Sequence, residues 1–163
     1  MRKLLTNGLV IFAGVVSLPA TVSNPAQPRP DYGKDPRLAL LRNFFRDYDC
    51  PAVVYSEEFL KAADAHNLDW RLLPSITLIE TGGGREARSN NLFGWDCGRA
   101  VFSSAPDAIH HVAFNLARSR LYRNKSLDRK LRTYNTDATY GARVKSVMRR
   151  LGSTPRLSAS SPR

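Results

Sequence analysis

The spacing of apolar residues constrains the fold of this 163-residue chain more than any other feature. Between residues 36 and 151, apolar side chains recur every three or four positions, which is typical of the buried face of an α-helix. These stripes comprise Leu38, Leu41 and Phe45; Phe59, Leu60 and Ala63; Leu72, Leu73, Ile76 and Ile79; Ile109, Val112, Ala113 and Leu116; Leu127, Leu131 and Tyr134; and Tyr140, Val144, Val147 and Leu151. No segment alternates well enough to predict a strand, although residues 100–103 could form a short hairpin arm. We therefore expect a mainly α domain with a short loop or hairpin arm.

Polar residues and helix breakers set boundaries for these helices. Residues expected to cap a helix or to occupy its first turn are Ser56, Asp69, Ser104, Pro106 and Asp137. Cys50-Pro51 is expected to end the first helix, and the three glycines at residues 82–84 are expected to end the third.

Both ends of the chain have the composition of segments outside a folded domain. Arg2 and Lys3 precede an apolar run at residues 9–16 and then small residues, which predicts a signal peptide over residues 1–23. The alternative is an uncleaved membrane anchor, but the run is shorter than the about 20 apolar residues of a comfortable span. Residues 24–35 are expected to be a proline-rich linker and residues 152–163 a disordered tail. We therefore expect one secreted or periplasmic domain over residues 36–151, monomeric and without a stable membrane span after signal cleavage.

The charge balance indicates the kind of partner. The chain has 25 Lys and Arg residues against 14 Asp and Glu residues, a formal net charge of +11. Such a charge predicts a polyanionic partner, which could be nucleic acid, acidic lipid or an anionic cell wall. Export of the protein, which the predicted signal peptide implies, argues against nucleic acid as the partner.

Cys50 and Cys97 are the only cysteines in the chain. In an exported protein such a pair could form one disulfide, and the alternative is two separate buried thiols. The two cysteines lack the spacing of a zinc motif, and the adjacent His110 and His111 would point about 100° apart on a helix. We therefore expect no metal site.

Glu80 departs from the apolar pattern of its helix. It lies seven residues after Leu73 and four after Ile76, so it continues their stripe in the last helical turn. An apolar environment and the negative end of the helix dipole both disfavour the ionised carboxylate. A carboxyl group kept protonated near neutral pH can act as a general acid on a glycosidic oxygen. The alternative is a glutamate that turns outward at a frayed helix end.

Three segments in order carry a family resemblance. They are Glu-Thr-Gly-Gly-Gly at residues 80–84, Asn-Asn-Leu-Phe-Gly-Trp at residues 90–95 and Tyr-Asn-Thr-Asp-Ala-Thr-Tyr at residues 134–140. The series resembles the bacterial glucosaminidases of the autolysin and flagellar-hydrolase type, glycoside hydrolase family seventy-three of the lysozyme-like superfamily. The resemblance covers about residues 56–151. It implies a lysozyme-like helical domain that cleaves the β-1,4 glycan backbone of peptidoglycan without a cofactor.

The resemblance also implies roles for individual residues. Glu80 matches the catalytic glutamate, and Tyr134 matches a tyrosine that lies near the acid and helps to position it or the sugar. The residues that match the segment shaping the glycan groove are Asn91, Phe93 and Gly94. Trp95 could stack on a sugar or fill the interior of its lobe. Asn135 replaces the family's usual alanine. The resulting Tyr-Asn pair at residues 134–135 is similar to the one found in the related lytic transglycosylases.

The sequence does not identify the second catalytic group. Hydrolysis of a glycoside usually uses two carboxyl groups, and the candidates for the second are Glu86, Asp96 and Asp107. Without a second carboxylate, groups of the substrate itself could complete the reaction and leave an anhydro sugar, as in lytic transglycosylases. A non-catalytic module that binds cell-wall glycan is the alternative from another class.

Overall fold

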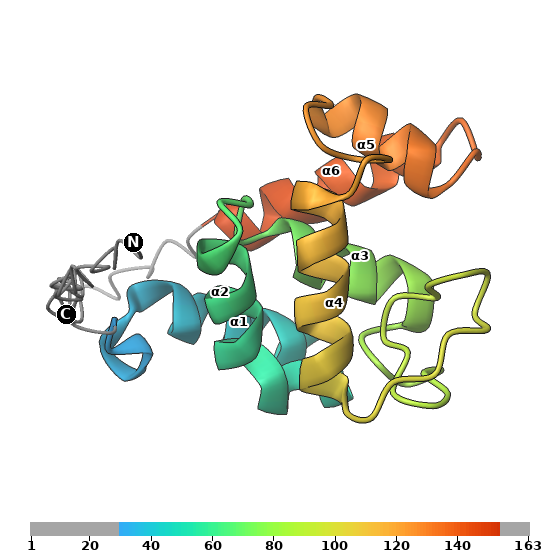
Figure 1. Cartoon of the computed structure of the whole chain (residues 1–163). Helices are drawn as coiled ribbons and strands as arrows, with labels where there is room; N and C mark the ends of the chain where they lie inside the picture. Colours follow the sequence, from blue (N-terminus) through green and yellow to red (C-terminus); the bar gives the residue numbers. More distant parts are fainter. Residues whose placement is uncertain (1–29, 154–163) are drawn as a thin grey trace, which may run out of the picture. The chain divides into compact units, whose positions relative to one another are not determined.

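The computed structural model describes residues 30–153, and helices make up its regular structure (Figure 1). The six α-helices of this part are α1 (Pro36–Asp47), α2 (Ser56–Ala65), α3 (Leu72–Thr81), α4 (Ala105–Arg118), α5 (Leu127–Tyr134) and α6 (Tyr140–Gly152). Two short 3-10 helices, η1 (Tyr32–Lys34) and η2 (Pro51–Tyr55), precede α1 and α2. No strand occurs in residues 30–153, so the expected mainly α class is confirmed.

Several predictions concern residues outside the described range. The predicted signal peptide, the proline-rich residues 24–29 and the tail from residue 154 all lie there. Within residues 30–153, no helix is both long and apolar enough to cross a membrane.

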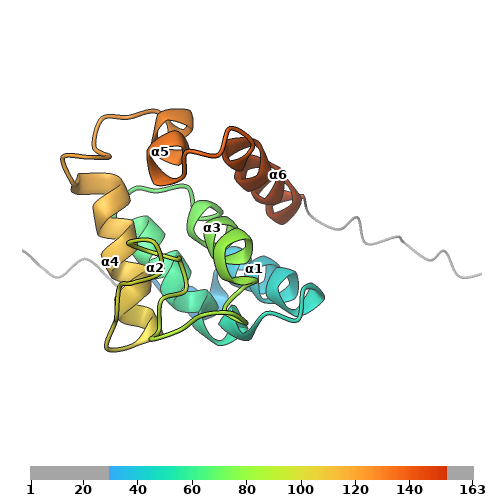
Figure 2. The ribbon, with the colours of Figure 1, turned by 90° about the vertical axis from the view of Figure 1, so that its right-hand side faces the viewer.

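Helix α3 is the most deeply buried element. Its buried residues, which occupy nearly all sides of the helix, are Leu72, Leu73, Pro74, Ser75, Ile76, Thr77 and Thr81. A helix that is apolar on most of its faces belongs in the interior of a helical domain. Figure 2 shows α3 with α2 on one side and α6 on the other, and both pack against it. α4 packs on α2, and α5 packs on α6.

The folded part begins within the segment predicted to be a linker. The Asp35 carboxylate accepts a hydrogen bond from Arg37 N at 2.8 Å and so caps α1. The Tyr32 hydroxyl donates to Asp64 of α2 at 3.2 Å, and Arg37 also pairs with Asp64 at 2.7 Å. These polar contacts fix residues 31–35 without any apolar periodicity, which is why the sequence pattern did not include them.

One predicted cap is confirmed. The Ser104 hydroxyl accepts from Asp107 N at 3.2 Å and Pro106 lies in the first turn of α4. As predicted, the glycines at residues 82–84 end α3, with Gly82 in the left-handed conformation (φ +59°).

Three other predicted caps are wrong. Ser56 is already the first residue of α2, and its hydroxyl donates to the Val53 carbonyl at 2.7 Å. Asp69 and Asp137 instead accept from the backbone N–H two residues later, from Arg71 at 3.0 Å and from Thr139 at 2.8 Å. Such turns place each aspartate before the helix, so that Arg71 and Thr139 directly precede α3 and α6.

The connection from α3 to α4 is a long loop without strands, so the alternative of a hairpin arm at residues 100–103 is wrong. Residues Ser89, Asn90, Asp96 and Cys97 of this loop have positive φ, a backbone conformation that extended strands do not use. Two hydrogen bonds join the start of this loop to its end. Phe102 N donates to the Ser89 carbonyl at 3.1 Å, and Asn90 Nδ2 donates to the Phe102 carbonyl at 2.9 Å.

The predicted disulfide is also wrong, because Cys50 and Cys97 are both free thiols. Cys50 is buried where the end of α1 packs against Gly83, while Cys97 lies exposed in the long loop. A side chain at residue 83 would collide with the Cys50 thiol, so a glycine is required there. Burial raises the pKa of the Cys50 thiol.

Candidate active site

Glu80 lies in the last turn of α3, one residue before the helix ends. Its side chain is partly buried, and its Oε1 atom is buried without a hydrogen-bond partner among residues 30–153. The outward orientation that was the alternative for this glutamate therefore does not occur. A buried, unpartnered carboxyl oxygen is costly as an anion and much less costly in a neutral acid.

Burial is also the main influence on the titration of this group. It raises the pKa of the Glu80 carboxyl above its ordinary value, while the Tyr140 hydroxyl and the positive charge of Arg143 act in the opposite direction. The upward direction of this pKa shift agrees with the expectation from the sequence. Arg143 is also engaged elsewhere, because its Nη1 atom pairs with Asp137 Oδ2 at 3.5 Å.

Two tyrosines form one wall beside Glu80. Tyr134 at the end of α5 and Tyr140 at the start of α6 stack with their ring centroids 5.9 Å apart and their planes within 4° of parallel. The Tyr134 hydroxyl donates to the Phe93 carbonyl at 2.6 Å, so Tyr134 joins α5 to the long loop. Burial and the nearby Glu80 carboxylate raise the pKa of both phenols, so both remain protonated.

The Tyr140 hydroxyl faces the Glu80 carboxyl group. The two groups interact without a hydrogen bond of ordinary geometry, since the Tyr140 hydroxyl and Glu80 Oε1 are both buried and unpartnered in the described part of the chain. The Tyr140 hydroxyl nevertheless favours the ionised form of Glu80 and so partly offsets the effect of burial on its pKa. Tyr140 was not predicted to be a site residue, although it closes the third motif.

The loop segment after Glu80 is held by two side chains. Asn91 is buried and bonds twice to Trp95, donating to its carbonyl at 3.0 Å and accepting from its N–H at 2.9 Å. Thr81 donates to the Leu92 carbonyl at 2.7 Å and thereby attaches this turn to the end of α3. Phe93 is fully buried in the core, so it supports the turn and offers no surface to a ligand. Thr81 was not predicted, and its position directly after Glu80 was the only available signal.

Gly94 passes directly against the Glu80 carboxyl group. A Cβ atom at residue 94 would lie 2.9 Å from Glu80 Oε2, and the residue has φ +58°. Both the space and the backbone conformation therefore favour glycine. The same turn that Asn91 closes thus brings the backbone of residue 94 to the acid.

A pocket of about 480 Å³ opens beside Gly94, a volume within the usual range of small-ligand pockets. Residues 94–97 line it from the long loop, and Leu121, Tyr122, Thr133 and Tyr134 line it from the opposite side. Gly94 and Tyr134 belong both to the pocket and to the surroundings of Glu80, so the pocket adjoins the acid.

Trp95 forms part of the pocket wall and is itself held by aromatic neighbours. Its ring meets Tyr134 edge-on at 5.6 Å and His111 edge-on at 6.0 Å, and Tyr122 lies at 6.1 Å. The indole is only partly buried, so it packs inside its lobe and also exposes surface to the pocket.

The three candidate second carboxylates differ in position. Asp96 lines the pocket and pairs with Arg99 at 2.8 Å. Glu86 is exposed and does not line this pocket, and Asp107 accepts from the Ser103 hydroxyl at 3.0 Å in the first turn of α4. The structure therefore brings only Asp96 of the three to the pocket that adjoins Glu80.

Asn135 has a local role. It follows α5, and its Oδ1 atom accepts from Asp137 N at 2.9 Å, which closes the turn toward α6. It does not line the pocket beside Glu80. Residues 30–153 contain no group of three or more His, Cys, Asp and Glu side chains that could hold a metal ion.

No protein-family model matches this chain, and no curated protein matches it in sequence. The class that the fold and the site define is thus a small, mainly helical domain with a partly buried glutamate beside a pocket.

Proposed function

We propose that this protein cleaves the β-1,4 glycan backbone of bacterial peptidoglycan in the cell envelope, as a lysozyme-like enzyme with endo-β-N-acetylglucosaminidase activity. The observation that supports this most is the Glu80 carboxyl group, whose pKa is raised by burial and which adjoins a pocket through Gly94 and Tyr134. The resemblance of residues 80–84, 90–95 and 134–140 to the glucosaminidase motifs supports the same proposal.

Glu80 would act as the general acid. In its neutral form it can donate a proton to the glycosidic oxygen as the bond to the anomeric carbon breaks. Because the carboxylate that results is the less favourable form in this partly buried site, Glu80 keeps its proton to a higher pH than an exposed glutamate does and is readily reprotonated after the transfer. The Tyr140 hydroxyl lies near that carboxylate and favours its ionised form.

Trp95 and Tyr122 supply apolar ring surface to the pocket, which suits the faces of pyranose rings. This supports binding of a glycan strand across the pocket mouth. The Trp95 ring packs edge-on against Tyr134 and His111, and this packing fixes its orientation. It can therefore hold a sugar ring in one orientation.

The reaction after bond cleavage has two candidate courses. Asp96 is the carboxylate in the pocket and would activate water in a hydrolase, although its ion pair with Arg99 must then open or share the charge. The second course needs no second carboxylate, because groups of the sugar itself complete the reaction and leave an anhydro end, as in lytic transglycosylases.

Mass analysis of purified sacculi digested by the protein tests the proposal. Fragments that end in reducing N-acetylglucosamine are the expected result. Anhydro ends would assign the transglycosylase course on the same substrate. Intact sacculi with bound protein would contradict enzymatic function and indicate a non-catalytic glycan-binding module.

A further inference from the structure

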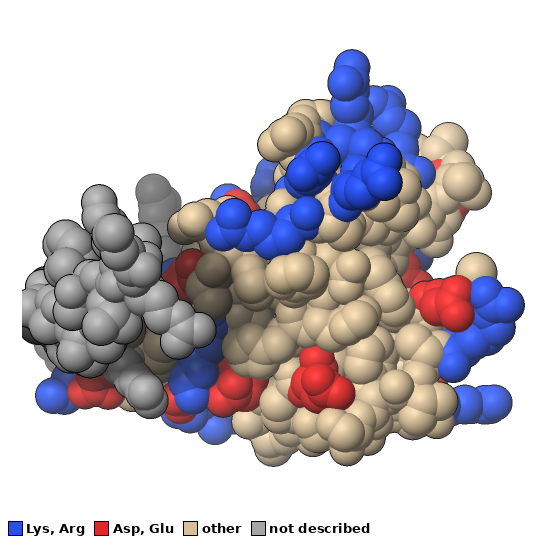
Figure 3. Space-filling model, in the orientation of Figure 1, with Lys and Arg blue, Asp and Glu red and all other residues tan. Residues whose placement is uncertain are grey.

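The charges of the domain are unevenly distributed along the chain. Residues 31–107 hold 12 acidic and 9 basic side chains, whereas residues 108–153 hold 2 acidic and 11 basic ones. The two parts therefore have formal net charges of −3 and +9. In space, Lys and Arg side chains gather over the C-terminal end of α4 and over α5, at the top of the view in Figure 3. Such a polarised surface attracts anions to one side of the molecule.

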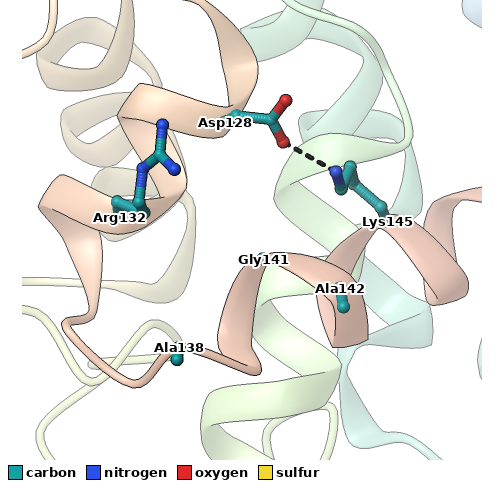
Figure 4. Close-up of a pocket in the computed structure, with 6 residues that line it drawn as sticks. All are labelled: Asp128, Arg132, Ala138, Gly141, Ala142 and Lys145. Carbon is teal, nitrogen blue, oxygen red and sulfur yellow. Dashed lines mark hydrogen bonds and ion pairs between the residues drawn. The ribbon is translucent and has the colours of Figure 1, made fainter.

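Five arginines of this region belong to no ion pair in the part of the chain that the structure describes. They are Arg118, Arg120, Arg123, Arg129 and Arg132, and we refer to them as the arginine face. Asp128 is the one acidic residue among residues 118–132. Figure 4 shows its carboxylate turned toward Lys145 of α6, with which it pairs at 2.7 Å beside a small cavity. The positive charge of the arginine face is therefore largely unneutralised.

The two lysines of the same stretch bond to the protein itself. Lys130 Nζ donates to the Leu116 carbonyl at 2.7 Å, which ties α5 to the end of α4. Lys125 Nζ donates to the Thr133 hydroxyl at 2.9 Å, which ties the connecting segment to α5. The end of α4, the segment after it and α5 therefore form one connected support for the arginines.

The arginine face is separate from the pocket of the candidate active site. After α4, the N–H groups of Tyr122 and Arg123 both donate to the Ser119 carbonyl, at 3.1 and 2.8 Å, which makes a helical turn. Leu121 and Tyr122 of this turn line the pocket. Arg120 and Arg123 are three residues apart, so they share the opposite side of the turn, and neither lines the pocket. An anion bound by these arginines therefore leaves the pocket open.

The chemistry of the arginine face fits a polymer that carries phosphates. Arginine keeps its charge throughout the pH range of folded proteins and binds phosphate oxygens with two N–H groups at once. The five side chains come from α4, the turn and α5, so one small anion cannot contact them all. A chain of phosphates can, and each phosphate that is neutralised adds to the affinity through the release of counterions.

Two other phosphate-bearing partners fit this face less well. A face that binds a membrane combines cations with exposed apolar side chains, but Leu121, the exposed large hydrophobic residue of this stretch, lines the pocket instead. Single-stranded nucleic acid stacks its bases on aromatic rings, and Tyr122, the one aromatic residue among residues 118–132, is buried. A rigid duplex touches a protruding corner such as that in Figure 3 along one line, whereas a flexible polymer can follow it.

We propose that the arginine face binds a linear phosphodiester polymer with a flexible polyol backbone and that it contacts this polymer through its phosphates alone. The inference goes beyond the proposed function and does not require it, because the arginine face and the pocket are separate. Binding through phosphates alone is electrostatic, so it weakens steeply as the salt concentration rises.

The test measures binding of the full chain to fluorescently labelled poly(glycerol phosphate), a soluble phosphodiester polymer without bases or acyl chains. The test variant is Arg120→Gln/Arg123→Gln/Arg129→Gln, which changes three exposed residues of the arginine face. The matched control is Arg42→Gln/Arg46→Gln/Arg149→Gln, which removes three exposed positive charges from α1 and α6. Since both variants lose the same net charge, a difference between them reports the position of the charges.

We expect the test variant to bind the polymer at least about tenfold more weakly than wild type at about 0.05 M salt, and the control to stay within about twofold of wild type. The slope of log affinity against log salt concentration should be shallower in the test variant by at least about 1, because fewer counterions are released.

Three results with the polymer would overturn the inference: no binding by wild type, no loss in the test variant, or equal losses in the test and control variants. Tighter binding of wild type to DNA of equal charge, lost in the test variant, would also overturn it and assign the arginines to nucleic acid. The same result with phosphatidylglycerol vesicles would assign them to a membrane surface. The proposed function fails separately, since it is judged by turnover of sacculi, which polymer binding does not measure.

Discussion

At the scale of single residues, the candidate site depends on a carboxyl group whose ionised form is poorly stabilised. Oε1 of Glu80 has no hydrogen-bond partner among the described residues, and burial raises the pKa of the group. A residue with a raised pKa lowers the free energy of unfolding as the pH rises, because the unfolded chain ionises it more easily. The acid that we propose for catalysis therefore has a cost in stability at neutral pH.

Replacing Glu80 should reveal this cost. Glu80→Gln should be as stable as wild type below about pH 4, where the carboxyl is neutral in both states, and more stable at pH 7. The gain should stay below about 1 kcal/mol, since the group is only partly buried and solvent screens it. Urea unfolding at the two pH values measures it. A variant less stable than wild type at pH 7 would contradict the raised pKa.

Gly94 gives a second prediction at this scale. Gly94→Ala should lower turnover of sacculi at least about tenfold, because the new methyl group displaces the Glu80 carboxyl and small displacements of catalytic groups are costly. It should also cost about 1–2 kcal/mol for the left-handed backbone.

Gly98→Ala is the matched control for Gly94→Ala. Gly98 also has a positive φ, of +80°, but no atom lies within 4 Å of an added Cβ. This variant should lose similar stability and keep its activity. Equal activity losses in the two variants would show that the contact with Glu80 is unimportant.

At the scale of elements, the site depends on how the end of α3 is attached to the long loop. The Thr81 hydroxyl donates to the Leu92 carbonyl and also accepts from Gly84 N at 3.2 Å. One side chain therefore holds the glycine turn and the Asn91–Gly94 turn together, and so determines where residue 94 meets the acid.

Thr81→Val tests this attachment. Valine keeps the shape but leaves the buried Leu92 carbonyl without its partner, so we expect a loss of about 1–3 kcal/mol in the free energy of unfolding. Thr77→Val is the control, because the Thr77 hydroxyl is buried without a partner in the described chain and its removal should be neutral or stabilising. Urea unfolding of both variants checks the prediction. Equal effects would contradict the role of the Thr81 hydrogen bonds.

The helices could be predicted from the sequence because their signal is local. Apolar stripes such as Leu72, Leu73 and Ile76 repeat within one helix, and each lies in the core. The caps were less predictable, because Asp69 and Asp137 bond to a backbone N–H two residues later instead of starting a helix. The competing turn has the same residue preference as a cap.

The contacts that build the site are mostly distant in sequence. The Tyr134 hydroxyl bonds to Phe93, and Trp95 packs on His111, across segments that no periodicity connects. The position of Glu80 could be predicted, because it depends on its own helix. The positions of Asp96 at the pocket and of Tyr140 beside the acid could not, because they depend on how the long loop and α6 pack against α3.

At the scale of the whole molecule, the two cysteines of the described part are free thiols in different environments. Cys50 is buried against Gly83, and Cys97 is exposed in the long loop. We expect one thiol of the native protein to react rapidly with a thiol reagent, and both to react after unfolding without reductant. The absence of reactive thiols in the unfolded, unreduced protein would contradict the structure at this point.

In the proposed reaction, one carboxyl group of the molecule donates the proton that cleaves the glycan. The most direct measurement is the rate at which Glu80→Gln digests purified sacculi, with its fold checked by circular dichroism. The variant should retain its fold and lose about 10²–10⁴-fold in turnover, since glutamine cannot donate a proton as an acid does. Glu86→Gln, which changes an exposed glutamate outside the pocket, should digest sacculi at the wild-type rate. A folded Glu80→Gln protein that digests sacculi as fast as wild type would contradict the role of Glu80 as the proton donor.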